Sequence, residues 1–441
     1  MTAGPYLVVD VGSTFTKAAL VSGGGDLLGT AAHRTTIETD VMNGYAAVAG
    51  SLAAHGDPAE ILMCSSAGGG LRLAVVGYER EVTAQAGRRV GLTSGAKVVH
   101  VAVGPLGAVG VDALRESRPD IVLLVGGTDG GNQEVLRHNA TRLARARIRP
   151  PIVLAGNAEA AGDVAAILAA TGRRFVVTDN VLPRIGVINP EPARSAIRAT
   201  FLQHVIGGKG LSRGPAFARL VRAATPDAVL TGVEVMADVV GGDVMVVDIG
   251  GATTDVYSVL TPQGEDATLA KDVVGPLWHA RTVEGDLGMR WNAEGIVSAA
   301  SSERILLSQN AIEYAAHVAS DVGHLPGGPA EWAAERDLSA AAAVVAARRH
   351  ARSQSPSEGP RPLRDVQLLV GSGGVLRHAP DGTAGFVLDA IRADHAGGWR
   401  TPQDARTAVD AAYVLCAVGL LAPDHPLAAR RLAATVIPGG P

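Results

Sequence analysis

Two short stretches of the chain combine an aspartate, glycines and hydroxyl side chains directly after an apolar run. The first runs from Tyr6 to Thr14 around Asp10, and the second runs from Val246 to Thr254 around Asp248. Each pattern predicts a strand, a tight glycine turn and a second strand. Glycine lets a ligand approach the backbone, and the N–H groups of such a turn can cradle an anion. A carboxylate at the strand end can hold the waters of a divalent cation.

Other glycine-rich and small-residue segments accompany these two stretches. Arg281–Arg290 is predicted to be a glycine-containing loop before a helix, and Val366–Leu376 to be a strand that runs into a glycine turn. Pro226–Val233 and Asp410–Leu420 read as helices dense in small residues, which allow a helix to cross another closely. A helical region follows the Arg281–Arg290 loop, and Ser353–Pro362 reads as a mobile loop.

The composition favours a multidomain protein without nucleic acid or a membrane as partner. With 441 residues, 47% of them apolar, the chain is too long for one ordinary core. The net charge is −4, and no basic block with interleaved aromatic residues occurs. The longest apolar run, around Tyr413–Ala422, is too short to span a bilayer, and Met1–Pro5 does not begin a signal peptide. These features predict a soluble cytoplasmic protein.

The two cysteines give no indication of a metal centre or a disulfide. Cys64 and Cys416 lie far apart, and neither belongs to a Cys-x-x-Cys pair or a Cys/His cluster. Cys64 falls in an expected strand and Cys416 in an expected apolar helix, so both are predicted to be core residues. Structural zinc and iron–sulfur sites are therefore not expected.

The middle of the first half has a different pattern from its beginning. Three strands and a helix near Asn43–His55 open the chain, whereas the segment from Ile61 to about Gly210 alternates short apolar runs with helical stretches. That alternation predicts a parallel α/β unit. The loops Gly126–Asn132 and Gly156–Asn157 follow two of its strands, where ligands bind in such sheets. Turn chemistry and helix caps explain the same residues equally well.

The order of these elements resembles the superfamily of ATPases that contains actin, Hsp70 and the sugar kinases. Asp10 and Asp248 head equivalent hairpins, each half ends in a small-residue helix, and Lys17 follows Asp10 at the actin spacing. The resemblance implies an α/β fold with duplicated actin-like/Hsp70-like ATPase domains of the RNase H-like type and a large inserted α/β subdomain. It implies domain I at 1–60 and 211–240, the inserted subdomain at 61–210, and domain II at 241–441 with a mostly helical insertion at about 292–362.

The resemblance also implies a divided site for ATP and Mg²⁺ between the two hairpins. Asp10 and Asp248 would hold the waters of the metal. Glu284 or Asp286 would orient the attacking water, or either would cap the next helix. Lys17 would add a positive charge, or would be a surface lysine of a strand. The other nucleotide-binding residues are expected to be Gly12, Ser13, Thr14, Gly250, Gly251, Thr253, Thr254, Gly285, Gly288, Gly371, Ser372, Gly373 and Gly374.

A narrower resemblance extends over essentially the whole chain. Ser65–Arg72, Leu124–Asn132 and Arg281–Arg290 resemble the accessory protein of glutamate (methylaspartate) mutase, the GlmL/MutL family, which is unrelated to the mismatch-repair protein of similar name. This resemblance implies a chaperone-like reactivating partner of an adenosylcobalamin-dependent mutase, with the glutamate mutase subunits as partners and slow Mg²⁺-dependent ATP hydrolysis. The chain has no Asp-x-His-x-x-Gly cobalamin motif, so it would act on the cofactor of another protein. The sequence does not reveal the oligomeric state, for which a homodimer is the candidate.

Two other functions are compatible with the same fold. A small-molecule kinase needs a carboxylate base near an acceptor hydroxyl, and Asp129 is the candidate that the sequence offers. It would turn over ATP with a polyol or an acid and no protein partner. An actin-like scaffold would instead form filaments, and sedimentation with and without ATP would detect them.

Overall fold

The computed structural model describes residues 4–67, 71–78, 84, 86–87, 90–91, 96–185, 187–205, 210–261, 279–352, 360–396 and 400–438. The chain divides into two compact units. Unit 1 comprises Met1–Val229 and Gln263–Gly275, and unit 2 comprises Leu230–Pro262 and Pro276–Pro441.

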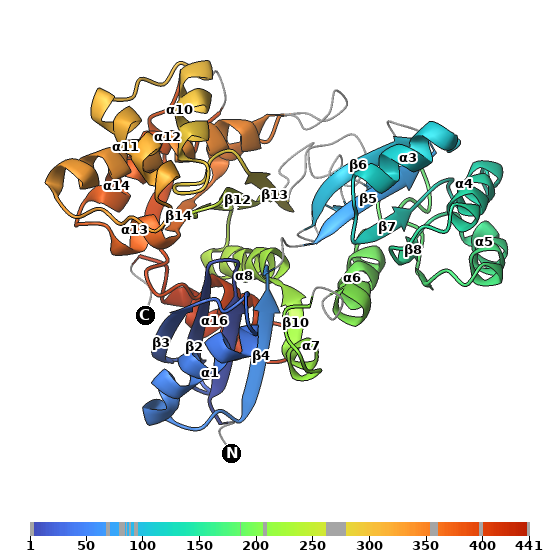
Figure 1. Cartoon of the computed structure of the whole chain (residues 1–441), viewed down its shortest axis with the longest axis horizontal. Coiled ribbons are helices and arrows are strands. Elements are labelled where there is room, and N and C mark those ends of the chain that lie inside the picture. The colour runs from blue at the N-terminus through green and yellow to red at the C-terminus, as the bar shows by residue number, and fades with distance from the viewer. Residues whose placement is uncertain are drawn as a thin grey trace. The chain divides into compact units, whose positions relative to one another are not determined.

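A mixed five-stranded sheet opens unit 1. Its order is β10-β4-β1-β2-β3 (Figure 1). Strands β1, β2 and β3 are antiparallel to their neighbours in this series, whereas β4 runs parallel to β1 and β10 runs parallel to β4. The strands are β1 (Tyr6–Val11), β2 (Phe15–Val21), β3 (Leu27–Arg34), β4 (Glu60–Ser65) and β10 (Val221–Ala224). The helices beside them are α1 (Val41–Leu52), with the short turn η1 (Ala53–His55), and α7 (Ala216–Leu220). Asp40 caps α1, accepting a hydrogen bond from the backbone N–H of Met42.

The second sheet of unit 1 is entirely parallel and has the order β6-β5-β7-β8-β9. Its strands are β5 (Arg72–Gly77), β6 (Lys97–Val103), β7 (Ile121–Leu124), β8 (Ile152–Leu154) and β9 (Phe175–Val177). Its helices are α3 (Ala108–Glu116), α4 (Glu134–Arg145), α5 (Ala158–Ala170), α6 (Glu191–Thr200) and the π-helical turn η3 (Phe201–Val205).

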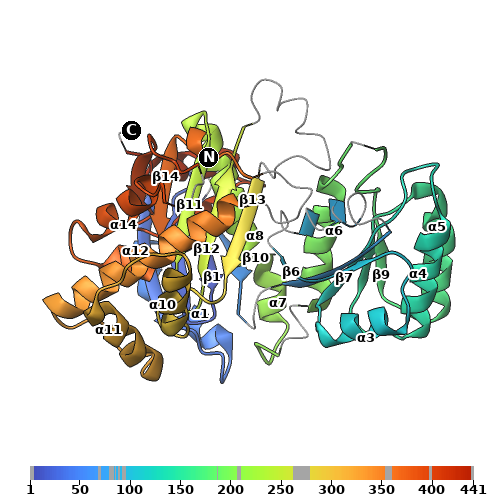
Figure 2. The same ribbon diagram turned by 90° about the horizontal axis from the view of Figure 1, so that it is seen from above.

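Alternate residues of this parallel sheet belong to two hydrophobic clusters, as expected where both faces are covered. Val122 and Leu124 pack in one cluster with residues of α3, α4 and α5. Ile121 and Leu123 pack in the other, together with Ile197 of α6. Figure 2 shows α3, α4 and α5 around the strands of this part of the chain. The alternating strands and helices confirm the parallel α/β unit that the sequence predicts.

Unit 2 contains a mixed sheet with the same connectivity as the first one. Its order is β13-β12-β11-β14-β15, again three antiparallel strands followed by two parallel ones. The strands are β11 (Val244–Ile249), β12 (Thr254–Val259), β13 (His279–Glu284), β14 (Leu368–Ser372) and β15 (Arg406–Val409). The repeated connectivity confirms the duplicated α/β fold of the actin-like, RNase H-like type.

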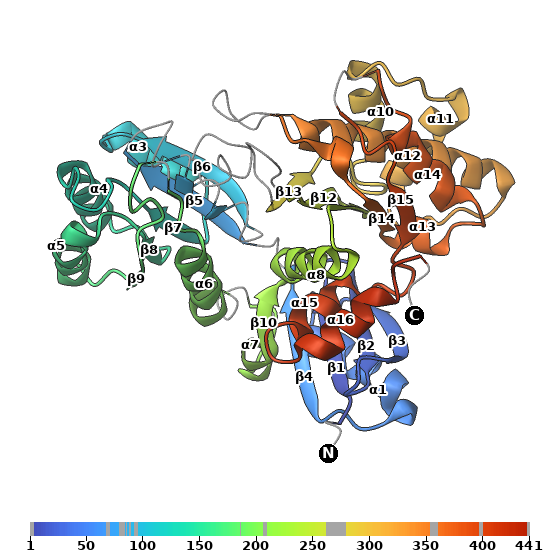
Figure 3. The ribbon, with the colours of Figure 1, turned by 180° about the vertical axis from the view of Figure 1, so that it is seen from behind.

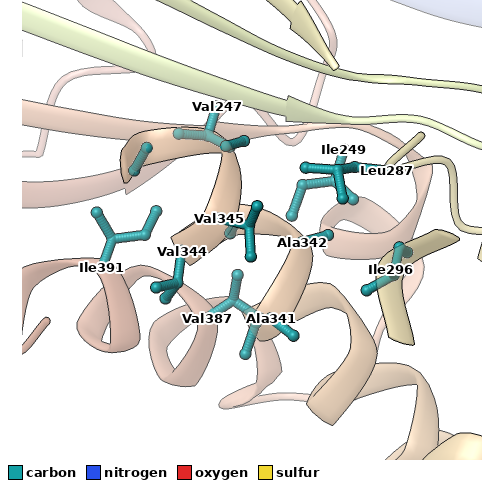
Figure 4. Packing of buried hydrophobic residues seen from close by; sticks show 14 of the residues in the cluster. Val247, Ile249, Leu287, Ile296, Ala341, Ala342, Val344, Val345, Val387 and Ile391 are labelled. Carbon is teal, nitrogen blue, oxygen red and sulfur yellow. The ribbon is translucent and has the colours of Figure 1, made fainter. Parts of the chain in front are cut away.

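Helices cover the face of this sheet that carries Val247 and Ile249. They are α10 (Ala293–Ser302), α11 (Gln309–Ser320), α12 (Pro329–Ala351), α13 (Gly374–His378) and α14 (Thr383–Arg392), with the short turn η5 (Leu363–Asp365). Ala342 and Val345 of the long helix α12 pack against the strand residues, and Val387 of α14 lies in the same cluster (Figure 4). The buried alanines of α12 let the helix lie close to the strands.

Two small-residue helices cross each other in unit 2. These are α8 (Thr225–Val240), of which Leu230–Val240 belongs to unit 2, and α15 (Leu415–Leu421), which α16 (Pro426–Ala434) follows (Figure 3). A Cβ on Gly232 would overlap the carbonyl oxygen of Leu415 and lie 3.4 Å from the N atom of Gly419. The close crossing expected from the small residues is therefore confirmed.

The structure corrects several element boundaries. Strands β5, β10 and β15 are not among the strands expected from the sequence. The helix expected at Asp410–Leu420 begins only at Leu415, and Arg281–Glu284 belongs to a strand rather than to a loop. Gly68–Gly70, and most of the loop expected at 353–362, lie outside the described residues. Among the helices that the structure describes, none is long and apolar enough to cross a membrane.

Candidate functional site

The first hairpin, between β1 and β2, has a closed backbone and exposed hydroxyl side chains. The N–H of Gly12 donates to the carbonyl oxygen of Phe15 at 3.0 Å, and a Cβ on Gly12 would lie 2.7 Å from that oxygen. Thr35 of the segment after β3 donates its hydroxyl to the carbonyl of Gly12 at 2.8 Å. Ser13 and Thr14 remain exposed at the tip. The hairpin is thus fixed from one side while its two hydroxyl residues face solvent.

Asp10 is buried at the end of β1 and holds a defined position. The Thr225 hydroxyl donates to its Oδ1 at 2.6 Å, and the thiol of Cys64 lies 3.5 Å from the same oxygen. Lys17 is directly opposite Asp10 in the β1–β2 register, so the two side chains point to the same face of the sheet. The hydroxyl of Thr225, at the start of α8, is a partner of Asp10 that the sequence does not indicate.

The second hairpin, between β11 and β12, is attached to the segment after β13 through its carbonyl groups. The carbonyl oxygen of Gly250 accepts from Met289 at 3.0 Å, and that of Gly251 accepts from the N–H groups of Arg290 and Trp291. The Asn292 side chain donates to the carbonyl of Ala252 at 3.1 Å. In a trans peptide the C=O and the next N–H point in opposite directions. The N–H groups of residues 251–253 therefore point away from the 285–292 segment.

Asp248 occupies the position in this hairpin that Asp10 occupies in the first. It is half-buried and lies beside Ser372 in the β11–β14 register. The hydroxyl of Tyr413 donates to its Oδ2 at 3.3 Å. Tyr413 has a φ of 58°, which is uncommon for a bulky residue. Asp410 stabilises this turn because its carboxylate accepts from the N–H groups of Val414 and Leu415.

A charged pair lies directly across the hairpin from Asp248. Asp255 faces Asp248 in the β11–β12 register, the position that Lys17 takes opposite Asp10. Arg281 of β13 donates two hydrogen bonds to Asp255 Oδ1, at 2.7 and 3.1 Å, and its guanidinium lies over the Tyr257 ring. Burial raises the pKa of the Tyr257 hydroxyl well above its ordinary value. The site residues expected from the sequence do not include this Asp255–Arg281 pair.

Glu284 and Asp286 both pair with one arginine of α12. Arg349 donates to Glu284 at 2.8 Å and to the two oxygens of Asp286 at 2.7 and 2.9 Å. Burial raises the pKa of Glu284 despite the arginine, whereas the hydrogen bonds from Arg349 lower the pKa of Asp286. The N-cap of α10 is Asn292. The suggestion that either acid caps this helix is therefore wrong.

Arg290 anchors the 285–292 segment to α12. Its guanidinium makes a bidentate ion pair with Glu335, at 2.7 and 3.1 Å, and donates to the carbonyl of His324. The side chains are 12% and 2% exposed. Gly288 of the same segment is buried against the hairpin, and a Cβ there would overlap Ala252. Gly285, in contrast, is exposed with no atom within 4 Å of an added Cβ.

The residues Gly371–Gly374 lie at the end of β14, next to Asp248. Gly371 pairs with Val247, and an added Cβ would lie 2.6 Å from a methyl group of Leu376. Gly373 has a φ of +104°, and its Cβ would overlap the Ile249 carbonyl and lie 2.9 Å from Asp248 Oδ1. Gly374 is exposed and has open space around it. Of these three glycines, only Gly374 has room for a side chain.

These contrasting surroundings give a matched pair of substitutions. We expect Gly373→Ala to destabilise unit 2 by about 2–4 kcal/mol, because alanine there combines an unfavourable φ with an overlap. Gly374→Ala should leave stability within about 0.5 kcal/mol of wild type and weaken ATP binding if the residue lies under the nucleotide. Denaturant unfolding and ATP titration measure the two effects. Equal destabilisation by both substitutions would contradict the distinction.

The polar loop after β7 is held together by buried asparagines. Asp129 Oδ1 accepts from the Ala158 N–H at 2.9 Å and from the Asn180 side chain at 2.9 Å. Asn157 caps α5, accepting from Glu159, and also donates to the Gly131 carbonyl. Turn and cap chemistry thus accounts for these contacts. The contacts hold Asp129 through Oδ1, and the residue is exposed.

The fold and these hairpins define the class of the protein, an α/β protein with duplicated domains of the actin-like, RNase H-like fold. The chain belongs to the MutL protein family, whose profile matches residues 6–437. It is 35% identical to Protein MutL of Clostridium tetanomorphum, over 97% of this chain and 98% of that protein. This is the family that the sequence motifs resemble.

Two solved structures are among those similar to this chain. A nucleotide-free acetone carboxylase is 15% identical, with a TM-score of 0.43, over 95% of this chain and 70% of the other. A ROK family glucokinase from Streptomyces griseus, in complex with glucose and AMPPNP, is 13% identical, with a TM-score of 0.34, over 95% of this chain and 98% of the other.

Proposed function

We propose that the protein is an ATP-dependent accessory protein that reactivates an adenosylcobalamin-dependent mutase such as glutamate mutase. The two aspartate–glycine hairpins, on two sheets of identical connectivity, are the observation that supports nucleotide binding most directly. Membership of the MutL protein family supports the accessory role. In this proposal the hairpins bind ATP, and the free energy of ATP binding and hydrolysis drives a change in the mutase.

The second hairpin fits an anionic ligand. Its carbonyl oxygens are occupied by the 285–292 segment, so the N–H groups of residues 251–253 point to the other side. Successive N–H groups that point outward are a common way to bind phosphate. Ser13 and Thr14, exposed on the first hairpin, supply further donors. Gly251 and Thr253 are proposed to bind phosphate through these N–H groups. Gly250 and Thr254 are proposed as neighbours of the phosphate, because the Gly250 N–H donates to the Thr253 carbonyl and the Thr254 hydroxyl donates to Leu287 at 2.7 Å.

The two aspartates of the hairpins are proposed to hold a divalent cation. Asp10 and Asp248 end equivalent strands, and each carboxylate is oriented by a hydroxyl group, from Thr225 and Tyr413. Bound Mg²⁺ would neutralise negative charge on the phosphoryl group that is transferred. Glu284, whose pKa burial raises, is the proposed residue for orienting water, and Lys17 is the proposed additional charge. Gly371–Gly374 would lie under the base and ribose.

The reactivating role requires that the nucleotide change the shape of the protein. We propose that the two hairpins close around the nucleotide and open after hydrolysis, as hinge-closing proteins do. We propose that this motion is transmitted to the inserted parallel α/β part, which pries the mutase open so that damaged cobalamin leaves and intact cofactor enters. The mutase, and not this chain, holds the cofactor in this account.

Reactivation of an inactivated mutase tests this proposal. Glutamate mutase inactivated with a damaged cobalamin should recover activity when free adenosylcobalamin, Mg²⁺, ATP and this protein are all present. The Asp248→Asn variant should fail under the same conditions, because its hairpin would no longer hold the metal waters. Recovery without ATP, or equal recovery with the variant, would contradict an ATP-driven step. If the cognate mutase does not recover, the reactivation role is wrong, whereas the proposal of a nucleotide site is not affected.

A further inference from the structure

The inserted parallel sheet of unit 1 has an unusual concentration of arginines at one edge. Three loops precede β7, β8 and β9 and therefore lie at the same end of these parallel strands. The first carries Arg118, the second Arg147 and Arg149, and the third Arg173 and Arg174. We call this set, together with Arg115 and Arg145 in the last turns of α3 and α4, the arginine edge. No aromatic residue occurs in residues 117–120, 146–151 or 171–174.

Direct contacts show that the three loops are neighbours. The guanidinium of Arg115 donates to the carbonyl of Ala146 at 2.7 Å, which joins the end of α3, directly before the first loop, to the second loop. The guanidinium of Arg173 donates to the carbonyl of Ile148 at 2.9 Å, which joins the third loop to the second. Adjacent strands lie about 4.8 Å apart, so the arginines of these loops form one surface.

Two of these arginines stand where a helix end commonly has glycine. Arg118 and Arg147 follow the C-caps of α3 and α4 and have φ values of 44° and 50°. The third loop has Gly172 in the equivalent position, with a φ of +65°. A left-handed conformation costs a side-chain-bearing residue about 1–2 kcal/mol. The two arginines are therefore more costly to the fold than the glycine found in the neighbouring loop.

Stabilisation of helix ends explains only part of the arginine edge. Arg115 and Arg173 donate to backbone carbonyls, as basic residues often do near helix C-termini. The exposed side chains of Arg118, Arg145, Arg147, Arg149 and Arg174 pair with no carboxylate in the described part of the chain. The acidic residues nearest in sequence to the first loop are Asp112, Glu116 and Asp120. Asp112 is paired with Arg115, Asp120 accepts from the backbone N–H of Arg72, and Glu116 is exposed. The edge is thus strongly positive on a chain whose net charge is −4.

We propose that the arginine edge is a docking surface for a protein partner with a carboxylate-rich face. Guanidinium groups bind carboxylates through paired N–H donors, and an array of them supplies both attraction at a distance and a defined geometry. A nucleic acid is disfavoured because the whole chain is acidic and the three loops offer no aromatic ring for base stacking. This surface is independent of the proposed nucleotide site, and it gives the inserted part of the chain a binding role of its own.

A charge-reversal experiment tests the docking surface with poly-L-glutamate as the acidic probe. Arg145→Glu, Arg149→Glu and Arg174→Glu together should weaken probe binding by tenfold or more in fluorescence anisotropy at low salt. Arg364→Glu, Arg400→Glu and Arg430→Glu together change the net charge equally at exposed positions of unit 2, and should alter the affinity less than twofold. Thermal unfolding checks both variants, and the corresponding glutamine triple replaces the glutamate triple if the latter does not fold.

Three outcomes would overturn the proposal. In the first, the wild-type protein does not bind poly-L-glutamate at low salt; in the second, both triple variants lose the same affinity for the probe. In the third, duplex DNA binds the wild-type protein at least as tightly as the probe and displaces it. The second outcome would indicate general electrostatics, and the third a nucleic-acid surface. None of these results depends on ATP binding, so failure here is distinguishable from failure of the proposed function.

Discussion

Replacing Asp248 by alanine is expected to lower Mg²⁺-dependent ATP hydrolysis by about a hundredfold or more while leaving the fold intact. The carboxylate stands at the end of β11, beside a turn whose N–H groups point outward, so its loss would remove the proposed anchor of the metal waters. The substitution creates little strain, because the side chain is only half-buried and its contact with Tyr413 is long, at 3.3 Å. Hydrolysis is measured as phosphate release over a range of Mg²⁺ concentrations.

The matched control is Asp389→Ala. Asp389 is an exposed aspartate of α14 in the same unit, paired with Arg392, and it is not among the proposed site residues. Its replacement should leave phosphate release unchanged. Circular dichroism and thermal unfolding should show both variants folded. Hydrolysis that is unchanged in Asp248→Ala would exclude the second hairpin from the site.

Replacing Arg290 by methionine is expected to cost about 3–5 kcal/mol of folding free energy, the range seen when one partner of a buried ion pair is removed. Glu335 is 2% exposed and would be left buried with a negative charge and no arginine. The 285–292 segment would also lose its attachment to α12, and this segment holds the second hairpin through three carbonyl groups. Denaturant unfolding monitored by circular dichroism measures the loss.

The control for this substitution is Arg336→Met on α12, the helix that carries Glu335. Arg336 pairs with Asp337 at the surface, with side chains 39% and 26% exposed, and such pairs are worth about 0–1 kcal/mol. Its guanidinium also lies over the Phe386 ring, which adds a contribution of similar size. If both substitutions lowered the free energy of unfolding by the same small amount, Arg290 would not be an anchor of the 285–292 segment. Restored stability in Arg290→Met combined with Glu335→Leu would support the explanation by an uncompensated charge.

Much of the fold follows from local patterns in the sequence. The strands β1 and β11 are apolar runs that end in an aspartate and glycines, and α8 and α15 are recognisable as helices rich in small residues. Two of the three missed strands are different, whereas β5 contains the apolar run Leu73–Val76 and was open to prediction. β10 and β15 have only four residues each, lie at sheet edges, and include an arginine, so no run of apolar residues reveals them. Their strand structure depends on pairing with β4 and β14, which is a tertiary property.

The sequence predicts which positions of the chain form the candidate site better than it predicts the contacts between their side chains. Asp255 is seven residues after Asp248, as Lys17 is after Asp10, and this shared spacing is a signal that could have identified it. Arg281, Tyr413 and Arg349 carry no such signal, because register and helix packing bring them to the hairpin from distant parts of the chain. Which of the residues touch a nucleotide stays a prediction.

Calorimetric titration with Mg²⁺-ATP tests whether the two hairpins bind one nucleotide together. We expect one ATP per chain, and a loss of Mg²⁺-dependent affinity of at least tenfold in both Asp10→Asn and Asp248→Asn. Asp389→Asn, the matched control, should bind as the wild type does. Two nucleotides per chain, or full affinity in either hairpin variant, would contradict a single divided site.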